Sequence, residues 1–437
     1  MSPCPPMTPD KLPQYPRQKF KSNDLSIELY CRGTREYAKL SYPVKYGLFS
    51  RLQTPEVEFE FNLNHEITHG RSRRDTWLHP SEWLKRTMGN DWIYYSSGGY
   101  AGVFEAIGEY YLPNLSYPTN SLLGGKPFAE PEVDRICSEW PDILERLPHG
   151  LPGMPGWARE WMAAIKKVTP EALEAKADSL FRIPGARVSV LPPDARHSDY
   201  DVIPLTIADG CLYKCRFCRI KNKKSFSPRT PQDILDQIRD LRNLYSRDIL
   251  NFNSLFLGEH DALSAPADLI LFAAQKAYKE FDFKNAYMSR PRLYMFGSVD
   301  GLLNASPDLF EKLNGLPFET CINLGFESAD QKTLDRLGKP ILVRQVKEAF
   351  HRARDINRKY PDLEITGNFV TDPGLPQSHT RAMLDLVRES LPRTTPKGSI
   401  YLSPLKFGSP SREMLYDFYR IKAASRLPMF LYIIQRL

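Results

Sequence analysis

Three cysteines, Cys211, Cys215 and Cys218, lie within eight positions in the stretch DGCLYKCRFCRIKNKK (209–224). The other four cysteines are scattered over the 437 residues, which is too few for a disulfide scaffold. A tight group of thiolates is typical of metal binding or redox chemistry. Iron–sulfur clusters are held by Cys thiolates, usually four. Three cysteines in one loop therefore predict a cubane whose fourth iron is open to a substrate or cofactor, as the open position is in catalytic zinc sites.

Other interpretations of the three cysteines stay open at this point. A structural zinc site needs a fourth ligand, and His260 and Cys321 are the candidates because the sequence has no second cysteine pair. A conventional electron-transfer cluster would take Cys321 as its fourth ligand. Chance clustering of core cysteines is disfavoured by Gly210 and the flanking charges. We expect Cys321 itself to be a core residue rather than a ligand.

The elements that must position these thiols alternate between strands and helices from residue 201 onward. Such alternation predicts parallel strands joined by right-handed crossovers. Six units are fewer than the eight of a closed barrel, so the fold class is α/β, a partial (β/α)6 TIM-like barrel preceded by an α+β N-terminal domain. Strands are expected at 202–208, 250–259, 293–299, 319–328, 363–372 and 399–407, and helices at 230–246, 266–280, 307–314, 342–358 and 378–391, with a final helix after the last strand.

Polar residues recur where these predicted strands end. In parallel α/β folds the carboxyl ends of the strands share one edge, and active groups lie there. The cysteine loop follows the first strand, so the other strand ends should face it. This convergence predicts that the second half of the chain is an enzyme core. The residues at these ends are Gly258 and Glu259, Ser298 and Asp300, Glu327 and Ser328, and Thr371 and Asp372.

The N-terminal half has no chemical motif that we can name. Residues 56–64 (EVEFEFNLN) alternate apolar and polar side chains, which predicts a half-buried strand, and helices are expected at 131–146 and 157–180. The Pro- and Asp-rich stretch 181–200 is predicted to link the halves, and the apolar end RLPMFLYIIQRL to be a helix. These features divide the chain into a flexible Pro-rich arm (1–20), an N-terminal α+β domain (21–195), a core (196–410) and a C-terminal helical segment (411–437).

Charge and hydropathy narrow the class of protein. No stretch reaches the roughly 18 apolar residues of a membrane span, and the first residues lack the apolar core of a signal peptide. We therefore expect a cytoplasmic location. The net charge of +7 over this length is more typical of a solvated surface than of a nucleic-acid footprint. The basic run RIKNKK (219–224) leaves nucleic acid as a possible partner that is not favoured.

The CxxxCxxC spacing, with Phe217 directly before the last cysteine, resembles the signature of the radical SAM superfamily. The resemblance implies that the three cysteines hold a [4Fe-4S] cluster whose unique iron binds S-adenosyl-L-methionine. It also implies that one electron cleaves this cofactor to a 5′-deoxyadenosyl radical that abstracts hydrogen from a substrate. A one-electron donor of the flavodoxin or ferredoxin type is implied as a partner. Phe217 would lie near the adenine.

More of the core, over about 201–410, shares this resemblance. LFLGEHDAL (255–263) is similar to the Gly-Gly-Glu segment that receives the cofactor's amino group, with Leu257 in place of the first glycine; Gly258 and Glu259 match. LGFESADQKTLDRLGKP (324–340) resembles a segment of the branch that holds the elongator catalytic subunit, tRNA methylthiotransferases and oxygen-independent coproporphyrinogen oxidases. Glu327 and Ser328 would then contact the carboxylate or ribose side of the cofactor. Ala329 replaces the usual glycine, and Gln377 stands near a usual Glu.

Several of these residues also have purely structural interpretations. Glu259 could be a capping partner or a surface acid, Asp300 and Asp372 could be capping residues, and Glu327 could pair with Arg290 or Lys339.

Absent features also separate the possible functions. No second group of three cysteines follows the core, which argues against methylthio transfer, and no cobalamin-binding signature precedes it. A radical SAM enzyme of unknown substrate is therefore our main expectation. The alternatives are a non-catalytic iron–sulfur protein with a redox or structural role, and an RNA-modifying radical SAM protein. We also expect the N-terminal domain to cap the barrel mouth, a hypothesis based only on its position before the core.

Overall fold

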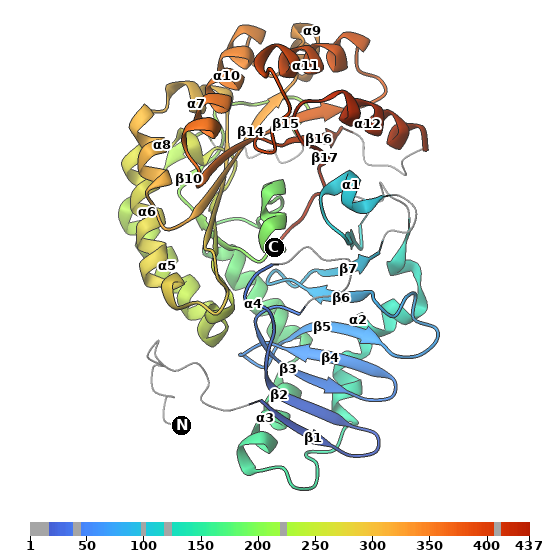
Figure 1. Ribbon diagram of the computed structural model, residues 1–437. Coiled ribbons are helices and arrows are strands. Elements are labelled where there is room, and N and C mark those ends of the chain that lie inside the picture. The colour runs from blue at the N-terminus through green and yellow to red at the C-terminus, as the bar shows by residue number, and fades with distance from the viewer. Residues whose placement is uncertain (1–16, 38–44, 98–101, 118–124, 219–224, 406–411) are drawn as a thin grey trace.

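The computed structural model describes residues 17–37, 45–97, 102–117, 125–218, 225–405 and 412–437. Two β-sheets organise these residues, as Figure 1 shows. The predictions for residues 1–16 and for the basic run 219–224 lie outside the described residues. Residues 18–20, which were expected in the flexible arm, belong to strand β1. Among the described residues, no helix is both long and apolar enough to cross a membrane.

The first sheet is antiparallel, and its eight strands follow chain order. Strand β4 confirms the predicted alternation: Phe59 and Phe61 pack in the apolar core against the helices, whereas Glu58 and Glu60 lie on the other face. The strands are β1 (Gln18–Lys21), β2 (Ser26–Arg32), β3 (Leu48–Gln53), β4 (Val57–Phe61), β5 (Ile67–Ser72), β6 (Trp83–Arg86), β7 (Trp92–Ser96) and β8 (Leu112–Leu115).

Helices α2 (Pro131–Glu145) and α3 (Gly156–Lys167) contribute most of the helical side chains in this core, and α4 (Pro170–Arg182) follows them. The single helix predicted for 157–180 is wrong because it is two helices. Thr169 caps the second one, accepting a hydrogen bond from the backbone N–H of Ala172, and Pro170 occupies its first turn. A proline is tolerated at the first position of a helix, because the N–H that it lacks would have no partner within the helix.

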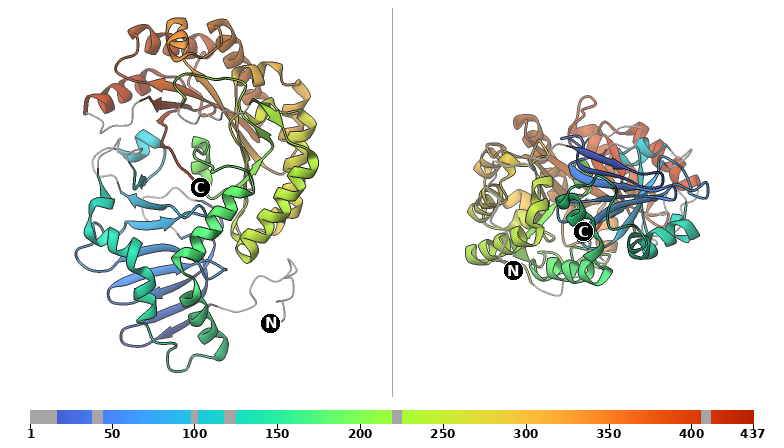
Figure 2. Two further views of the ribbon diagram at one scale, coloured as in Figure 1. Left: turned by 180° about the vertical axis from the view of Figure 1, so that it is seen from behind. Right: turned by 90° about the horizontal axis from the view of Figure 1, so that it is seen from below.

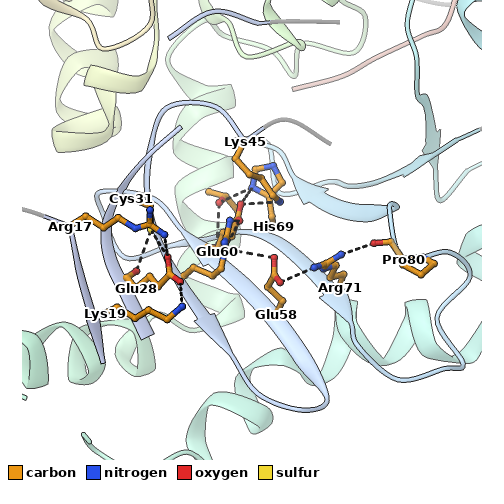
Figure 3. A network of polar contacts seen from close by, with 12 residues as sticks. Arg17, Lys19, Glu28, Cys31, Lys45, Glu58, Glu60, His69, Arg71 and Pro80 are labelled. Atoms are coloured by element: carbon orange, nitrogen blue, oxygen red, sulfur yellow. Dashed lines mark hydrogen bonds and ion pairs between the residues drawn. The ribbon is translucent and has the colours of Figure 1, made fainter. Parts of the chain in front are cut away.

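The face of this sheet opposite the helices carries a layered network of charges (Figure 3). Cations of one strand pair with carboxylates of the neighbouring strand. Arg17 and Lys19, at β1, pair with Glu28 of β2, and Arg71 of β5 pairs with Glu58 of β4. The carboxylates are nearly buried, whereas Arg17 is 63% exposed. Each buried carboxylate is thus neutralised by cations that cover it, which offsets part of its desolvation cost.

The second sheet is parallel and has seven strands in chain order, which confirms the α/β prediction. Leu257 of β12 aligns with Leu205 of β9 on one side and with Met295 of β13 on the other. All six predicted strands are present. They are β9 (Ile203–Thr206), β12 (Ser254–Gly258), β13 (Arg292–Gly297), β14 (Glu319–Glu327), β15 (Leu363–Thr371) and β16 (Ile400–Pro404), and β17 (Met429–Leu431) is an additional one.

Helices cover the outer face of this curved sheet (Figures 1 and 2). The five helices that were predicted with bounds agree with the observed ones to within a residue, because caps and hydrophobic periodicity mark their ends; Thr230, for example, forms a capping box with Asp233. The helices at Val299–Asn304 and Gln331–Leu337 were not predicted. The helices are α5 (Pro231–Tyr245), α6 (Ala267–Glu280), α7 (Val299–Asn304), α8 (Pro307–Asn314), α9 (Gln331–Leu337), α10 (Val343–Lys359), α11 (Gln377–Ser390) and α12 (Arg412–Ala424).

The prediction of a helix for the apolar end RLPMFLYIIQRL is wrong. Met429–Leu431 forms β17, which pairs in parallel with β16, and no helix follows it in the described residues. Met429 and Leu431 are buried. A short apolar run after a proline does not show by its periodicity whether it is helix or strand, and here pairing at the edge of the sheet decides.

The interior of the curved sheet is filled by two segments from outside the repeating units. A 3-10 helix at Pro193–Ser198 and the last residues of the chain lie together there, and the views in Figures 1 and 2 show the green segment beside the C-terminus. Asp194 accepts hydrogen bonds from the hydroxyls of Thr366 and Tyr401. Part of the stretch predicted as a linker is therefore barrel core, and the predicted boundary at 195–196 falls inside the 3-10 helix.

The N-terminal sheet contacts the barrel at the amino ends of its strands. The ammonium of Lys85 donates hydrogen bonds to Asp199 and Asp201, just before β9, and Asn251, just before β12, exchanges hydrogen bonds with Leu48. The cysteine loop follows the opposite, carboxyl end of β9. For the described residues, the prediction that this sheet caps the barrel mouth is wrong, because it closes the other end.

Candidate functional site

A cavity of about 520 Å³ lies at the carboxyl ends of the parallel strands. All three clustered cysteines and Phe217 line it, so the structure brings together the four residues that the sequence singled out in this loop. Glu327 lines it as well, from the end of β14. The remaining lining residues are Val190, Tyr213, Lys214, His260, Phe296, Gly297, Ser298, Gly325, Lys339 and Tyr432.

The three thiols differ in burial. Cys215 is buried, and burial raises the pKa of its thiol to about 11, an effect that the ammonium of Lys339 opposes. Cys211 and Cys218 are half-buried, and burial raises the pKa of Cys211 in the same direction. Thiols that are protonated in this way require compensating positive charge before they act as thiolate ligands.

Three thiols line one cavity, which matches the donor set of a cluster that has one open iron. A structural zinc site would need four ligands on one ion, whereas in a cubane each thiolate binds a different iron. Cys321, a candidate fourth ligand, is half-buried in β14, does not line the cavity, and packs against the apolar cluster of the barrel interior. Three sulfur ligands around one cavity therefore remain.

Glu327 and Lys339 form a buried ion pair in the wall of the cavity. Their Oε1 and Nζ atoms lie 3.1 Å apart, and the side chains are 11% and 4% exposed. Lys339 also lies over the ring of Tyr213, 5.1 Å from its centroid. Of the two partners predicted for Glu327, Lys339 is the correct one, because Arg290 pairs with Glu319.

The backbone before this pair explains how it is held. The register of β14 against β15 shifts between Gly325 and Glu327, which is a β-bulge, and Glu327 has φ +64°. A Cβ on Gly325 would lie 2.5 Å from the Glu327 Oε1 atom and 3.3 Å from the Lys339 Nζ atom. The bare glycine backbone thus makes room for both charged groups.

Ser328 lies outside the cavity lining, although the sequence predicts that it contacts the cofactor. It is fully buried, and its Oγ atom lies 2.7 Å from Nδ1 of His379. The other ring nitrogen, Nε2, lies 2.8 Å from the carbonyl oxygen of Val370, which can only accept, so Nε2 carries the proton and Nδ1 accepts from Ser328. The Ser328 hydroxyl is therefore already used in holding the start of the α9 unit to α11.

The segment after β12 reaches the cavity through His260. Gly258 ends β12, and Glu259 does not line the cavity; its Oε2 atom lies 3.3 Å from Nε2 of His260, which does. At the next strand end Ser298, rather than Asp300, caps α7, accepting a hydrogen bond from the backbone N–H of Gly301, and Asp300 accepts one from the side chain of Gln345. Asp372 accepts a hydrogen bond from the backbone N–H of Gly374 in the turn before α11, whose N-cap is Pro376.

Four further residues line the cavity: Lys339, Tyr213, His260 and Tyr432. From the sequence, Lys339 was considered only as a partner of Glu327 and His260 only as a zinc ligand, whereas Tyr213 and Tyr432 were not predicted. Tyr213 lies within the cysteine loop, and its hydroxyl accepts a hydrogen bond from the backbone N–H of Asp300. Tyr432 had no signal, because it was assigned to a helix.

Comparison with known proteins agrees with this site. Residues 205–387 match the family model described as "Radical SAM superfamily". The chain contains a radical SAM domain. This span includes the cysteine loop, Glu327 and Lys339, whereas the N-terminal sheet lies outside it.

Curated relatives of the radical SAM domain are similar over part of their length. The ribosomal protein uS12 methylthiotransferase RimO of Oleidesulfovibrio alaskensis is 26% identical over 216 residues, 48% of this chain and 47% of that protein. RimO of Paraburkholderia phymatum is 23% identical over 304 residues, 65% of this chain and 59% of that protein. The chain thus spans about half of the length of the relatives it matches.

Solved structures show a lower similarity. Methylornithine synthase (PylB) aligns with a TM-score of 0.32 and 11% identity, covering 61% of this chain and 79% of that one. A radical SAM methyltransferase from Sphaerobacter thermophilus aligns with a TM-score of 0.31 and 15% identity, covering 53% and 66%.

Proposed function

We propose that this protein is a radical SAM enzyme that uses a [4Fe-4S] cluster and S-adenosylmethionine to abstract hydrogen from a substrate. The observation that carries the proposal is the single cavity into which Cys211, Cys215, Cys218 and the Glu327–Lys339 pair all open. When bound, the cluster supplies one electron for cleavage of S-adenosylmethionine to a 5′-deoxyadenosyl radical. The substrate and the complete reaction are not part of this proposal.

Different side chains of the cavity would bind the cluster and S-adenosylmethionine. The three cysteines would hold three corners of the cluster and leave the fourth open. Lys339 is the buried cation of the wall, so it would receive the carboxylate of S-adenosylmethionine, and Glu327 keeps its ammonium in place. Phe217 and Tyr213 would supply aromatic surface for the adenine. Together with Phe296 they form an apolar wall that would limit the entry of water into the cavity.

Methylthio transfer, the activity for which the RimO relatives are named, is not part of the proposal. It would use a second set of three cysteines, and the described cysteines outside the loop lie on three separate elements, Cys31 in β2, Cys137 in α2 and Cys321 in β14. A one-electron donor of the flavodoxin or ferredoxin type and a cytoplasmic location complete the proposal, since the cluster needs a reductant and free thiols.

The test is anaerobic reconstitution with iron and sulfide, followed by dithionite and S-adenosylmethionine and chromatography for 5′-deoxyadenosine. We expect about four irons per chain and 5′-deoxyadenosine from the wild type, and neither from Cys215→Ala. Cys321→Ala is the matched control, because this thiol lies outside the cavity, and it should retain both. A stable cluster that never yields 5′-deoxyadenosine would favour the redox or structural alternative, and zinc in place of iron would contradict both.

A further inference from the structure

Several backbone contacts hold the described part of the cysteine loop. Within the described residues, it is held by the two-residue pairing of β10 (Ala208–Asp209) with β11 (Ser227–Pro228), by a bridge from Cys211 to Ser225, and by a turn in which the Cys218 N–H approaches the Cys215 carbonyl at 3.4 Å. A cluster needs its three sulfur atoms at fixed separations. A further contact reaches the half of the loop that carries Cys215 and Cys218.

Arg216, between these two cysteines, provides that contact. Its backbone N–H donates to the Leu337 carbonyl at 3.0 Å, and its Nη2 atom donates to the Asp335 carbonyl at 2.7 Å. Both acceptors belong to the last turn of α9, and the Asp335 carbonyl also accepts a hydrogen bond from the backbone N–H of Gly338 at 3.1 Å. A guanidinium is favoured there because it faces the negative end of the helix dipole.

The residue after α9 is adapted to this contact. Gly338 has φ +64°, the left-handed conformation of a helix C-cap, and a Cβ there would lie 2.6 Å from Nε and 2.8 Å from Cγ of Arg216. The next residue is Lys339, which returns into the cavity to meet Glu327. One short turn thus contacts the cysteine loop on one side and supplies the buried cation of the cavity on the other.

We propose that Arg216 is a positioning residue that fixes the Cys215–Cys218 turn against the C-terminus of α9. The inference rests on the proposed function, since the turn is fixed for cluster binding. Arg216 does not line the cavity, and it would act on the cluster ligands only through the backbone of the loop. The geometry of the thiols relative to the Glu327–Lys339 pair therefore depends on a side chain outside the cavity lining.

The test compares Arg216→Ala with Arg344→Ala, which removes an exposed arginine at the start of α10 and changes the net charge equally. Hydrogen–deuterium exchange is measured on the metal-free protein for peptides that cover 211–218, with α11 peptides as the internal reference. Iron release to a chelator is measured on the reconstituted protein. We expect exchange in the loop and iron release to accelerate about tenfold in Arg216→Ala, the effect of one charge-assisted hydrogen bond, and neither to change in Arg344→Ala.

The outcomes separate the inference from the proposed function. Unchanged exchange in Arg216→Ala would overturn the inference whether or not the protein holds a cluster. Faster exchange with unchanged iron release would overturn the positioning role, because the contact would then serve only the fold. If the wild type binds no cluster, the proposed function fails, and the exchange measurement alone decides whether Arg216 restrains the loop. Thermal unfolding shows whether the variant has lost its fold as a whole, and Arg216→Lys, which keeps the charge, should lie between the two extremes.

Discussion

Removal of the Lys339 ammonium should weaken both the fold and cofactor binding. The Nζ–Oε1 distance of 3.1 Å corresponds to about 5 kcal/mol of attraction at an effective dielectric constant of about 20. Both side chains are nearly buried, so Lys339→Met leaves the Glu327 carboxylate unpaired in the cavity wall. Breaking a buried pair in this way costs about 3–5 kcal/mol of unfolding free energy. The expected result is a loss of this size in urea unfolding of the metal-free protein.

The double variant Lys339→Met/Glu327→Gln separates charge from shape. It removes both charges, and we expect it to recover most of the stability that Lys339→Met loses, because no uncompensated charge remains. In both variants the affinity for S-adenosylmethionine should be about 10- to 100-fold lower than in the wild type, since the ammonium that would bind the cofactor's carboxylate is absent. Isothermal titration on the reconstituted protein measures this.

The reasoning about the pair would be refuted by either of two results. If Lys339→Met lost less than about 1 kcal/mol, the pair would behave as a surface ion pair. If the double variant were no more stable than the single one, the charge of Glu327 would not be the cause. Lys339→Arg is the conservative control, and it should keep most of the affinity.

Three further predictions concern other parts of the structure. Ser328→Ala removes the hydroxyl that His379 accepts from, so we expect a loss of about 1–3 kcal/mol in unfolding free energy with an unchanged affinity for S-adenosylmethionine; a large loss of affinity would restore a direct contact. Asp194 is buried, and burial raises the pKa of its carboxyl to about 6. Its contribution to the free energy of unfolding, up to about 3 kcal/mol, is therefore complete below about pH 4 and is lost as the pH rises through 6. Asp194→Asn should remove this pH dependence from unfolding free energies measured between pH 4 and 7. Pro170→Ala should leave two separate helices, because the Thr169 cap remains; hydrogen–deuterium exchange across Lys167–Ala172 reports this, and protection continuous through Thr169 would contradict it.

The sequence was sufficient for the repeating part of the fold. Each β/α unit shows a strand of buried residues followed by a capped amphipathic helix, and such local signals do not depend on the rest of the molecule. The cysteine loop could be placed for the same reason, because it follows a strand whose end faces the mouth. The ligand role of Cys211, Cys215 and Cys218 nevertheless stays a prediction until iron is measured.

Features that depend on contacts distant in sequence could not be predicted. Nothing local distinguishes Met429–Leu431 as a strand, because only the free edge of β16 makes it one. Ser328 directly follows Glu327, which lines the cavity, yet its hydroxyl is bonded to His379 of α11 instead. The side of the barrel that the N-terminal sheet closes is likewise decided by pairs such as Lys85 with Asp199, which are far apart in the chain.

The origin of the residues that line the cavity indicates where specificity for a substrate would arise. The cysteines and the Glu327–Lys339 pair come from the repeating units, whereas Val190 and Tyr432 reach the cavity from the two segments that fill the barrel. Tyr432 donates its hydroxyl to the Leu191 carbonyl at 2.7 Å, so the two segments are joined where they meet the cavity. Changes in these segments can alter the shape of the cavity without disturbing a strand of the sheet. Because the fold of the sheet does not determine these two segments, it does not identify the substrate either.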